Sequence, residues 1–482
     1  MIQRLALTLL LTCSSLVAAP SLHAQSNAAA GETPTTAPTT APSDASGDIS
    51  ETPAFSFSGF GTLGLAHTQG HGAAFIRDLT QPRGASNRGL SFAQDSRIGV
   101  QANLSLGNNL EAVTQILSRY RNNNSFDPEI TWGFLKYTFN DQIEIRAGRI
   151  GFDAYIAADS RDIGYSYLWV RPPVEYYGPL FFPYEDGGDI LFRTPIADGV
   201  GRIKFYSGVT RQKLSSLMEQ REWAGGIRTP AIGSIEDLEQ SRVLGGHIEF
   251  QNNHWTVRLG EARLYHTSDF APGAFDLQGI LAAQAMVATA GDPGAGIAPN
   301  PQLGNALQSF ARDANTAGKK ITMDSLAVAY EDGPLQTSMA ISHLSGNAIV
   351  FPNIKSAYFL LGYRFGALTP YAVLSTVKAK KSDRSDILQR LGANPAIIGI
   401  TNFLATSPLA TQTTHSLGLR YDFAENIALK FQADFIRNRD CSPVALPIGS
   451  SASCAPPLLW PTVPVNWNGR AQVYTATLDF TF

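Results

Sequence analysis

The feature that most constrains the fold is an alternation of apolar and polar residues that recurs from residue 54 to the end of the chain. In "SRIGVQANLSL", Ile98, Val100 and Leu104 fall on one side, and Arg97 and Gln101 fall on the other. Successive residues of a β-strand point to opposite faces, so this period of two predicts strands with one apolar and one polar face. The alternation returns in "DQIEIRAG", "RIKFYSGV", "HSLGLRYDF" and "NIALKFQADF". It is typical of antiparallel sheets.

Short and long connections alternate between these strands. Seven short turns lie at 107–109, 140–141, 196–200, 252–254, 332–334, 366–367 and 424–426. Eight long connections lie near 69–95, 121–129, 151–187, 212–241, 267–319, 346–353, 379–412 and 439–469. This count predicts sixteen strands with every short turn at one end, which is the asymmetry of outer-membrane barrels.

Closure of the sheet pairs every backbone N–H and C=O group, as a lipid environment requires. We therefore predict an all-β fold, a 16-stranded antiparallel transmembrane β-barrel formed by residues 54–482. The alternative is a soluble two-sheet sandwich, which would not collect its long connections at one end. Within the long connections, "DLQGILAAQAMV" predicts a helix, and so does "NPAIIGITNFLA" with Asn394 as its cap.

The first 24 residues have the pattern of an export signal, with Arg4 before an apolar stretch and Leu22-His23-Ala24 as the cleavage site. The alternative is a membrane anchor, for which the apolar stretch is short. Residues 25–53 are rich in Ala, Thr and Pro, cannot form a core, and are predicted to be an extended periplasmic tether.

Charge and cysteine content narrow the functional classes. The formal net charge of −3 gives no indication of a nucleic-acid partner. After signal removal only Cys441 and Cys454 remain, and in an exported chain we expect them to form a disulfide. No His or further Cys stands near them, so we expect neither a metal nor another cofactor.

The stretch "FSGFGTLGLAH" places Gly59, Gly61 and Gly64 in the spacing of a dinucleotide-binding loop. That motif requires a helix after the glycines, and here the alternation of a strand continues instead. We interpret the glycines as strand positions that permit a bend or a close approach beside bulky aromatic residues. The chain ends in "YTATLDFTF", an aromatic strand ending at Phe482 that is similar to the signal read by the barrel-insertion machinery.

Five stretches together resemble the 16-stranded trimeric general porins of Gram-negative outer membranes, over residues 54–482. They are "FSGFGTLGLAHT", "DSRIGVQANLSLGNNLEAVTQI", "TWGFLKYTFNDQIEIRAGRI", "DSRDIGYSYLWVRPPVEYYG" and the terminal strand. The resemblance implies a homotrimer with a water-filled channel, in contact with outer-membrane lipid and lipopolysaccharide. It also implies that the third external loop folds into the barrel as a constriction.

By order of elements, the third long connection is residues 151–187, in which Arg161 and Arg171 accompany the acids Asp153, Asp159, Asp162, Glu175, Glu185 and Asp186. The basic residues expected to face them from the wall are Arg97, Arg119, Lys136, Arg146, Arg202 and Lys204. Acids opposite bases would produce a transverse electric field that favours hydrophilic solutes.

The inward charges on the strands indicate a slight preference for anions such as carboxylates. We expect ten inward bases: Arg97, Arg119, Lys136, Arg146, Arg193, Arg202, Lys204, Arg258, Arg420 and Lys430. We expect seven inward acids: Glu111, Glu144, Asp189, Glu249, Asp422, Asp434 and Asp479.

The function predicted from the sequence is passive diffusion of small hydrophilic solutes across the outer membrane. No G-x-S-x-G or H-E-x-x-H motif occurs in the sequence, so we do not expect an enzyme. The alternatives are an outer-membrane barrel that serves as an adhesin or anchor, or one with hydrolase activity.

Overall fold

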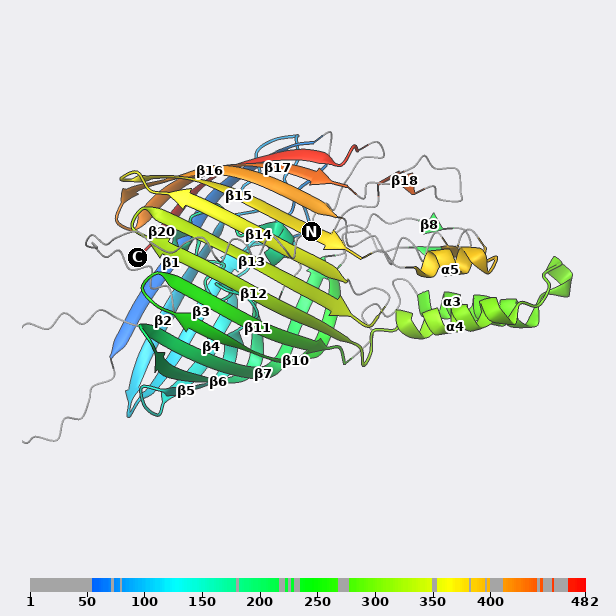
Figure 1. Ribbon diagram of the computed structural model, residues 1–482, viewed down its shortest axis with the longest axis horizontal. Coiled ribbons are helices and arrows are strands. Elements are labelled where there is room, and N and C mark those ends of the chain that lie inside the picture. The colour runs from blue at the N-terminus through cyan, green and yellow to red at the C-terminus, as the bar shows by residue number, and fades with distance from the viewer. Residues whose placement is uncertain are drawn as a thin grey trace, which may run out of the picture. The chain divides into compact units, whose positions relative to one another are not determined.

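The computed structural model describes residues 54–482 apart from 71–72, 79, 179–181, 216–221, 224–226, 229–234, 268–276, 349–352, 381–382, 395–396, 399–410, 440–442, 445–452 and 455–466. Sixteen strands form one closed antiparallel barrel, in which the first strand pairs with the last (Figure 1). This closed strand order confirms the predicted all-β antiparallel barrel. It leaves no strand edge unpaired.

The strands of the barrel follow one another in chain order. They are β1 (Phe55–Gln69), β2 (Arg97–Gly107), β3 (Leu110–Arg119), β4 (Glu129–Thr138), β5 (Ile143–Gly151), β6 (Tyr184–Ile196), β7 (Gly199–Ser215), β10 (Ile235–Gln251), β11 (Trp255–Tyr265), β12 (Lys320–Asp332), β13 (Leu335–Gly346), β14 (Ile354–Tyr363), β15 (Leu368–Ala379), β16 (Gln412–Ala424), β17 (Ile427–Asn438) and β20 (Arg470–Thr481).

The long connections carry the remaining elements. They hold the hairpins β8 (Glu222–Trp223) with β9 (Ile227–Arg228) and β18 (Pro443–Val444) with β19 (Ser453–Cys454), the short helices η1 (Gly164–Ser166), α2 (Val174–Tyr177) and η2 (Pro293–Ala295), and the helices α3 (Leu277–Ala290), α4 (Pro301–Ala314) and α5 (Arg384–Arg390). Among the described residues, none of these helices is long and apolar enough to cross a membrane.

The predicted connections match the observed strand ends. Each of the seven predicted short turns joins two neighbouring strands of the barrel, and the long connections lie at the other end (Figure 1). The helix predicted in the fifth connection is α3, whereas α4 and the two small hairpins were not predicted. Most of the segment after Asn394, together with residues 1–53, lies outside the described residues.

Apolar side chains cover the outer face of the barrel. Leu63, Phe205, Leu259 and Leu417 lie near the middle of their strands, point outward and are each more than half exposed. A continuous apolar belt of this kind is unfavourable in water and is the expected surface of a barrel in lipid.

Aromatic rings gather on the outer face next to the short turns. Tyr137 and Phe139 lie 4.6 Å apart between ring centres, and Trp255 and Tyr330 lie 4.5 Å apart. The same level carries the ring pairs Tyr363–Phe365, Tyr421–Phe423 and Phe480–Phe482. Aromatic rings of this kind form the girdle at the boundary between hydrocarbon and water in membrane barrels.

The first two glycines of β1 leave the space that two of these rings occupy. A Cβ atom at Gly59 would lie 2.2 Å from the ring of Phe482, and one at Gly61 would lie 2.3 Å from the ring of Phe480. The tips of the two phenylalanine rings therefore lie over the outside of β1 where the barrel closes. The interpretation of these glycines as sites of close approach is confirmed.

We predict that Phe205→Arg, in the apolar belt, lowers the stability of the barrel in lipid by about 2–4 kcal/mol, because it places a cation in hydrocarbon. Urea titration of the protein folded into lipid vesicles measures the change. Ser105→Arg, on the inner face near a short turn, is the matched control and should change stability little. An unchanged or raised stability for Phe205→Arg would show that this face contacts water.

Candidate functional site

The third long connection, residues 152–183 between β5 and β6, contacts inward-facing residues on widely separated strands. Asp153 binds Lys204 on β7 and Arg258 on β11, whereas Glu175 binds Ser375 on β15. In the closed strand order these partners lie on different sides of the barrel. Contacts with inner-face residues on both sides place this connection across the inside of the barrel.

Asp153 is the centre of the first ion cluster. Its carboxylate lies 2.7 Å from the Lys204 ammonium and 2.5 Å from the Arg258 guanidinium, and the imidazole of His247 is 3.8 Å away. Burial alone would raise the pKa of Asp153. The positive charges of Arg258 and Lys204 outweigh burial and hold this pKa well below its usual range.

Asp162 is the centre of the second ion cluster. It lies 3.2 Å from Arg77 of the first connection and 3.6 Å from Arg119 of β3. Burial opposes ionisation here too, but Arg119, Arg77 and Arg161 together lower the pKa of Asp162. Asp159 differs, because burial and the nearby Asp153 charge raise its pKa. One of its carboxyl oxygens is buried and has no hydrogen-bond partner in the described part of the chain.

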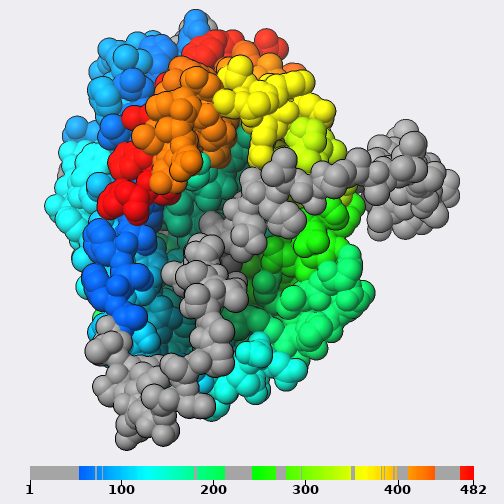
Figure 2. Space-filling view, turned by 90° about the vertical axis from the view of Figure 1, so that its left-hand side faces the viewer, coloured from blue at the N-terminus to red at the C-terminus, as the bar shows by residue number. Residues whose placement is uncertain are grey.

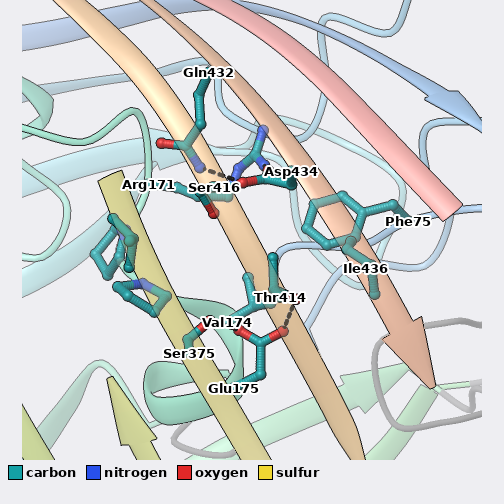
Figure 3. A pocket seen from close by; sticks show the side chains of 13 residues that line it. Phe75, Arg171, Val174, Glu175, Ser375, Thr414, Ser416, Gln432, Asp434 and Ile436 are labelled. Atoms are coloured by element: carbon teal, nitrogen blue, oxygen red, sulfur yellow. Dashed lines mark hydrogen bonds and ion pairs between the residues drawn. The ribbon is translucent and has the colours of Figure 1, made fainter. Parts of the chain in front are cut away.

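Arg171 and Glu175 anchor the connection to the opposite wall (Figure 3). Arg171 donates to Asp95, at 2.7 and 2.9 Å, and to Asp434 on β17 at 2.9 Å. Glu175 accepts hydrogen bonds from Ser375 at 2.6 Å, from Gln412 at 2.7 Å and from Thr414. Both charged groups are thus buried, and each is held by several hydrogen bonds. The cavity beside them is about 20 Å³, large enough for one water molecule.

The middle of the connection reaches the end of the barrel that carries the short turns. The hydroxyl of Tyr165 donates to the carbonyl of Glu425, in the turn between β16 and β17, at 2.5 Å. Arg420 donates to the Tyr165 and Tyr167 carbonyls, and Lys430 donates to the Gly164 carbonyl at 2.7 Å. The connection therefore spans the barrel from its long-connection end to its short-turn end.

Aromatic side chains fill the space around the connection. Tyr155 and Tyr176 lie 4.8 Å apart, and Tyr176 lies 5.1 Å from Tyr358 on β14. Every one of the sixteen strands contributes at least one buried inward side chain. Seen from the short-turn end, the surface is hollowed between opposite walls (Figure 2), and the inward residues there, such as Ser58 and Ser105, are exposed.

The structure separates the predicted constriction residues into groups. Asp153, Asp162, Glu175, Arg119 and Lys204 take part in contacts between the connection and the wall. Arg146 bonds instead to Asp189 on the neighbouring strand. Lys136 and Arg202 face inward near the short turns, where they pair with Glu111 and Glu249. Glu185 faces inward and is fully buried, and its carboxyl oxygens have no hydrogen-bond partner among the described residues.

The prediction for Asp186 is wrong. The connection ends before Tyr184, so Asp186 is the third residue of β6 and has the parity of the outer face. There it forms an ion pair with Arg149, at 2.7 Å. Cys441 lies outside the described residues, so its pairing with Cys454 stays a prediction.

The inward acids of the strands form direct ion pairs. All seven predicted inward acids lie on the inner face, and each has a basic partner within salt-bridge distance. Six of these seven acids pair with a base on the same strand or on a neighbouring strand, and Asp434 pairs with Arg171 of the connection. Arg97 is the exception among the inward bases, since all three guanidinium nitrogens are buried without a hydrogen-bond partner in the described part of the chain.

Sequence reasoning missed Asp95 and Arg77 as members of the site. Asp95 lies 76 residues from its partner Arg171, and Arg77 lies 85 residues from its partner Asp162. Both precede β2 in the first long connection, where no strand periodicity indicates the direction of a side chain. No local sequence signal identifies them.

No family model matches the chain, and no curated protein matches it. Solved structures with a similar fold include OmpT, an outer membrane protein of Vibrio cholerae in a trimer form, with 10% identity, a TM-score of 0.48, and coverage of 90% of this chain and 100% of that one. The anion-selective porin from Comamonas acidovorans is 12% identical, with a TM-score of 0.45 and coverage of 89% and 100%. Salmonella typhi OmpF in complex with daunomycin is 10% identical, with a TM-score of 0.46 and coverage of 89% and 97%.

We predict that Arg171→Met releases the third connection, because it leaves the carboxylates of Asp95 and Asp434 buried without their cation, at a cost of about 3–5 kcal/mol. Limited proteolysis of the folded barrel should cut residues 152–183 faster in this variant. Arg149→Met, which breaks the partly exposed outer pair, is the control and should leave the cleavage rate unchanged. Equal cleavage of Arg171→Met and wild type would contradict the anchoring role.

Proposed function

We propose that this protein is a channel of the Gram-negative outer membrane that admits small hydrophilic solutes by passive diffusion. In this proposal the third connection sets the aperture, residues 1–24 direct export, and the barrel assembles as a homotrimer. The terminal strand ending at Phe482 is recognised by the insertion machinery. The observation that carries the proposal is the opposite polarity of the two faces of one closed sheet.

The inner and outer faces have opposite chemistry. The outer face carries the apolar belt and the aromatic girdle, whereas the inner face carries all seventeen of the charged residues predicted there. Charged residues on the lumen side and apolar residues on the lipid side are the arrangement of a barrel with an aqueous path. The hollow at the short-turn end, lined by exposed polar residues, supports the same proposal.

The proposed channel also has a slight preference for anions. The inner faces of the strands carry ten bases and seven acids, and the guanidinium nitrogens of Arg97 have no hydrogen-bond partner among the described residues. One uncompensated cation beside the path attracts anions weakly. We therefore infer weak selectivity, with carboxylates among the admitted solutes.

A second candidate function has an observation in its favour. An outer-membrane anchor or adhesin needs a filled barrel, and the buried inward side chains on all sixteen strands fit that role. We do not propose a hydrolase, because the sequence contains neither the nucleophile motif G-x-S-x-G nor the metal-binding motif H-E-x-x-H.

We predict that purified protein in a planar bilayer shows a small single-channel conductance, because side chains occupy much of the cross-section. Replacing residues 154–182 by a short Gly-Ser linker should raise the conductance several-fold, and Arg420→Gln, which loosens the contacts of Tyr165 and Tyr167, should raise it less. Heat-modified migration of each variant on a gel verifies folding. Wild-type protein that folds but never conducts would favour the anchor.

We predict a small zero-current potential of the anion-selective sign under a tenfold KCl gradient. Arg97→Gln should move this potential toward zero, because it removes a buried cation that has no partner in the described residues. Arg149→Gln, on the outer face, should not move it. A potential of the cation-selective sign in wild type would contradict the inferred preference.

A further inference from the structure

The outer face of β14 to β20 carries four basic residues at the long-connection end. Lys355 on β14 lies directly opposite Lys378 on β15, and Arg437 on β17 lies directly opposite Arg470 on β20. All four have the parity of the outer face and are exposed. We name them the basic patch. Figure 1 shows its strands side by side along one wall of the barrel.

The four residues lie at a similar height in the barrel wall. Each lies eight to ten residues beyond the short-turn end of its strand, counted from Tyr363, Leu368, Ile427 and Phe480. With a rise of about 3.3 Å per residue and a tilt of about 40°, this places them about 20–25 Å from that end. The apolar band of a membrane barrel is about 25 Å tall, so the patch lies at its outer boundary.

The basic patch has no counter-ion in the described part of the chain. None of the four side chains lies within salt-bridge distance of an acidic group among the described residues. The neighbouring strands differ, because Glu261 on β11 binds Arg263 at 2.6 Å and Asp324 on β12 lies 3.9 Å from His343. Outward acids thus accompany the outward bases on β11 and β12, whereas the strands from β14 to β20 carry no outward acid.

Like charges placed directly opposite each other across two strands destabilise the sheet. Two such pairs lie on either side of β16, and their midpoints are three strand spacings apart, about 14 Å across the sheet. An anion bound at each pair would remove both repulsions. At the outer boundary of the apolar band, the anions within reach are those of lipid headgroups.

We propose that the basic patch binds a lipid of the outer leaflet whose headgroup carries two phosphates, one at Lys355 and Lys378 and the other at Arg437 and Arg470. This inference rests on the proposed membrane location, since it requires the outer face to meet lipid. The lysine pair supplies two point charges, whereas each arginine presents donors in a fork that matches phosphate oxygens. The bound lipid would cover the wall beside the closure of the barrel.

Native mass spectrometry of the full-length mature protein in detergent, titrated with diphosphoryl lipid A, tests the proposal. We expect the variant with Lys355→Gln, Lys378→Gln, Arg437→Gln and Arg470→Gln to bind this lipid at least tenfold more weakly than wild type. Monophosphoryl lipid A should bind wild type more weakly than the diphosphoryl form. Lys320→Gln, an exposed outward lysine on β12 outside the patch, is the matched control and should bind normally.

Equal affinity of wild type and the fourfold variant would overturn the proposal. Displacement of the lipid by millimolar inorganic phosphate would also overturn it, since the site would then recognise free phosphate. A fourfold variant with Lys→Arg at 355 and 378 and Arg→Lys at 437 and 470 should restore binding. The same preparations are inserted into planar bilayers, so a protein that conducts but does not bind the lipid refutes this inference alone. Failure to insert refutes the proposed function.

Discussion

The closure of the sheet between β1 and β20 is the constraint on which the rest of the structure depends. Ten residue pairs, from Phe60 with Thr481 to Gln69 with Gln472, join the first and last strands of the barrel. Once the barrel is closed, every strand residue points either inward or outward, and a shift of one residue would exchange the two faces. This parity sends the phenylalanines of the terminal strand outward over Gly59 and Gly61, and it sends Lys430 and Asp479 inward as a buried pair.

The interior is organised by buried charges that the third connection and the wall share. Asp153, Asp162 and Arg171 each bond to partners far away in sequence, so the connection is held at several separate points. Removing one member of a buried pair costs more than the pair contributes, because it leaves the other charge unpaired. The position of the connection is therefore specified by several contacts, and its displacement would require several of them to break together.

Much of the fold could be predicted from the sequence, because strand parity and turn chemistry are local signals. The sixteen strands, the seven short turns and the inward direction of seventeen charged residues follow from a period of two. The sequence pattern sets the start of β6 four residues too late and therefore places Asp186 in the connection. As a strand residue, Asp186 points to the outer face. The partnership of Asp95 with Arg171 could not be predicted, since it depends on the path of an irregular segment through the barrel. Helix α4 was missed although Asn300 caps it and Pro301 begins it, a local signal that was available.

The central claim is that lipid meets the outer face and water meets the inner face of one sheet. Depth-dependent fluorescence quenching measures this directly, with a dye attached at Leu259→Cys or at Ser105→Cys in a protein that carries Ser at positions 441 and 454. The account predicts that brominated lipids quench the dye at residue 259 and aqueous iodide does not, whereas the dye at residue 105 shows the reverse. Quenching of both dyes by iodide alone would contradict it.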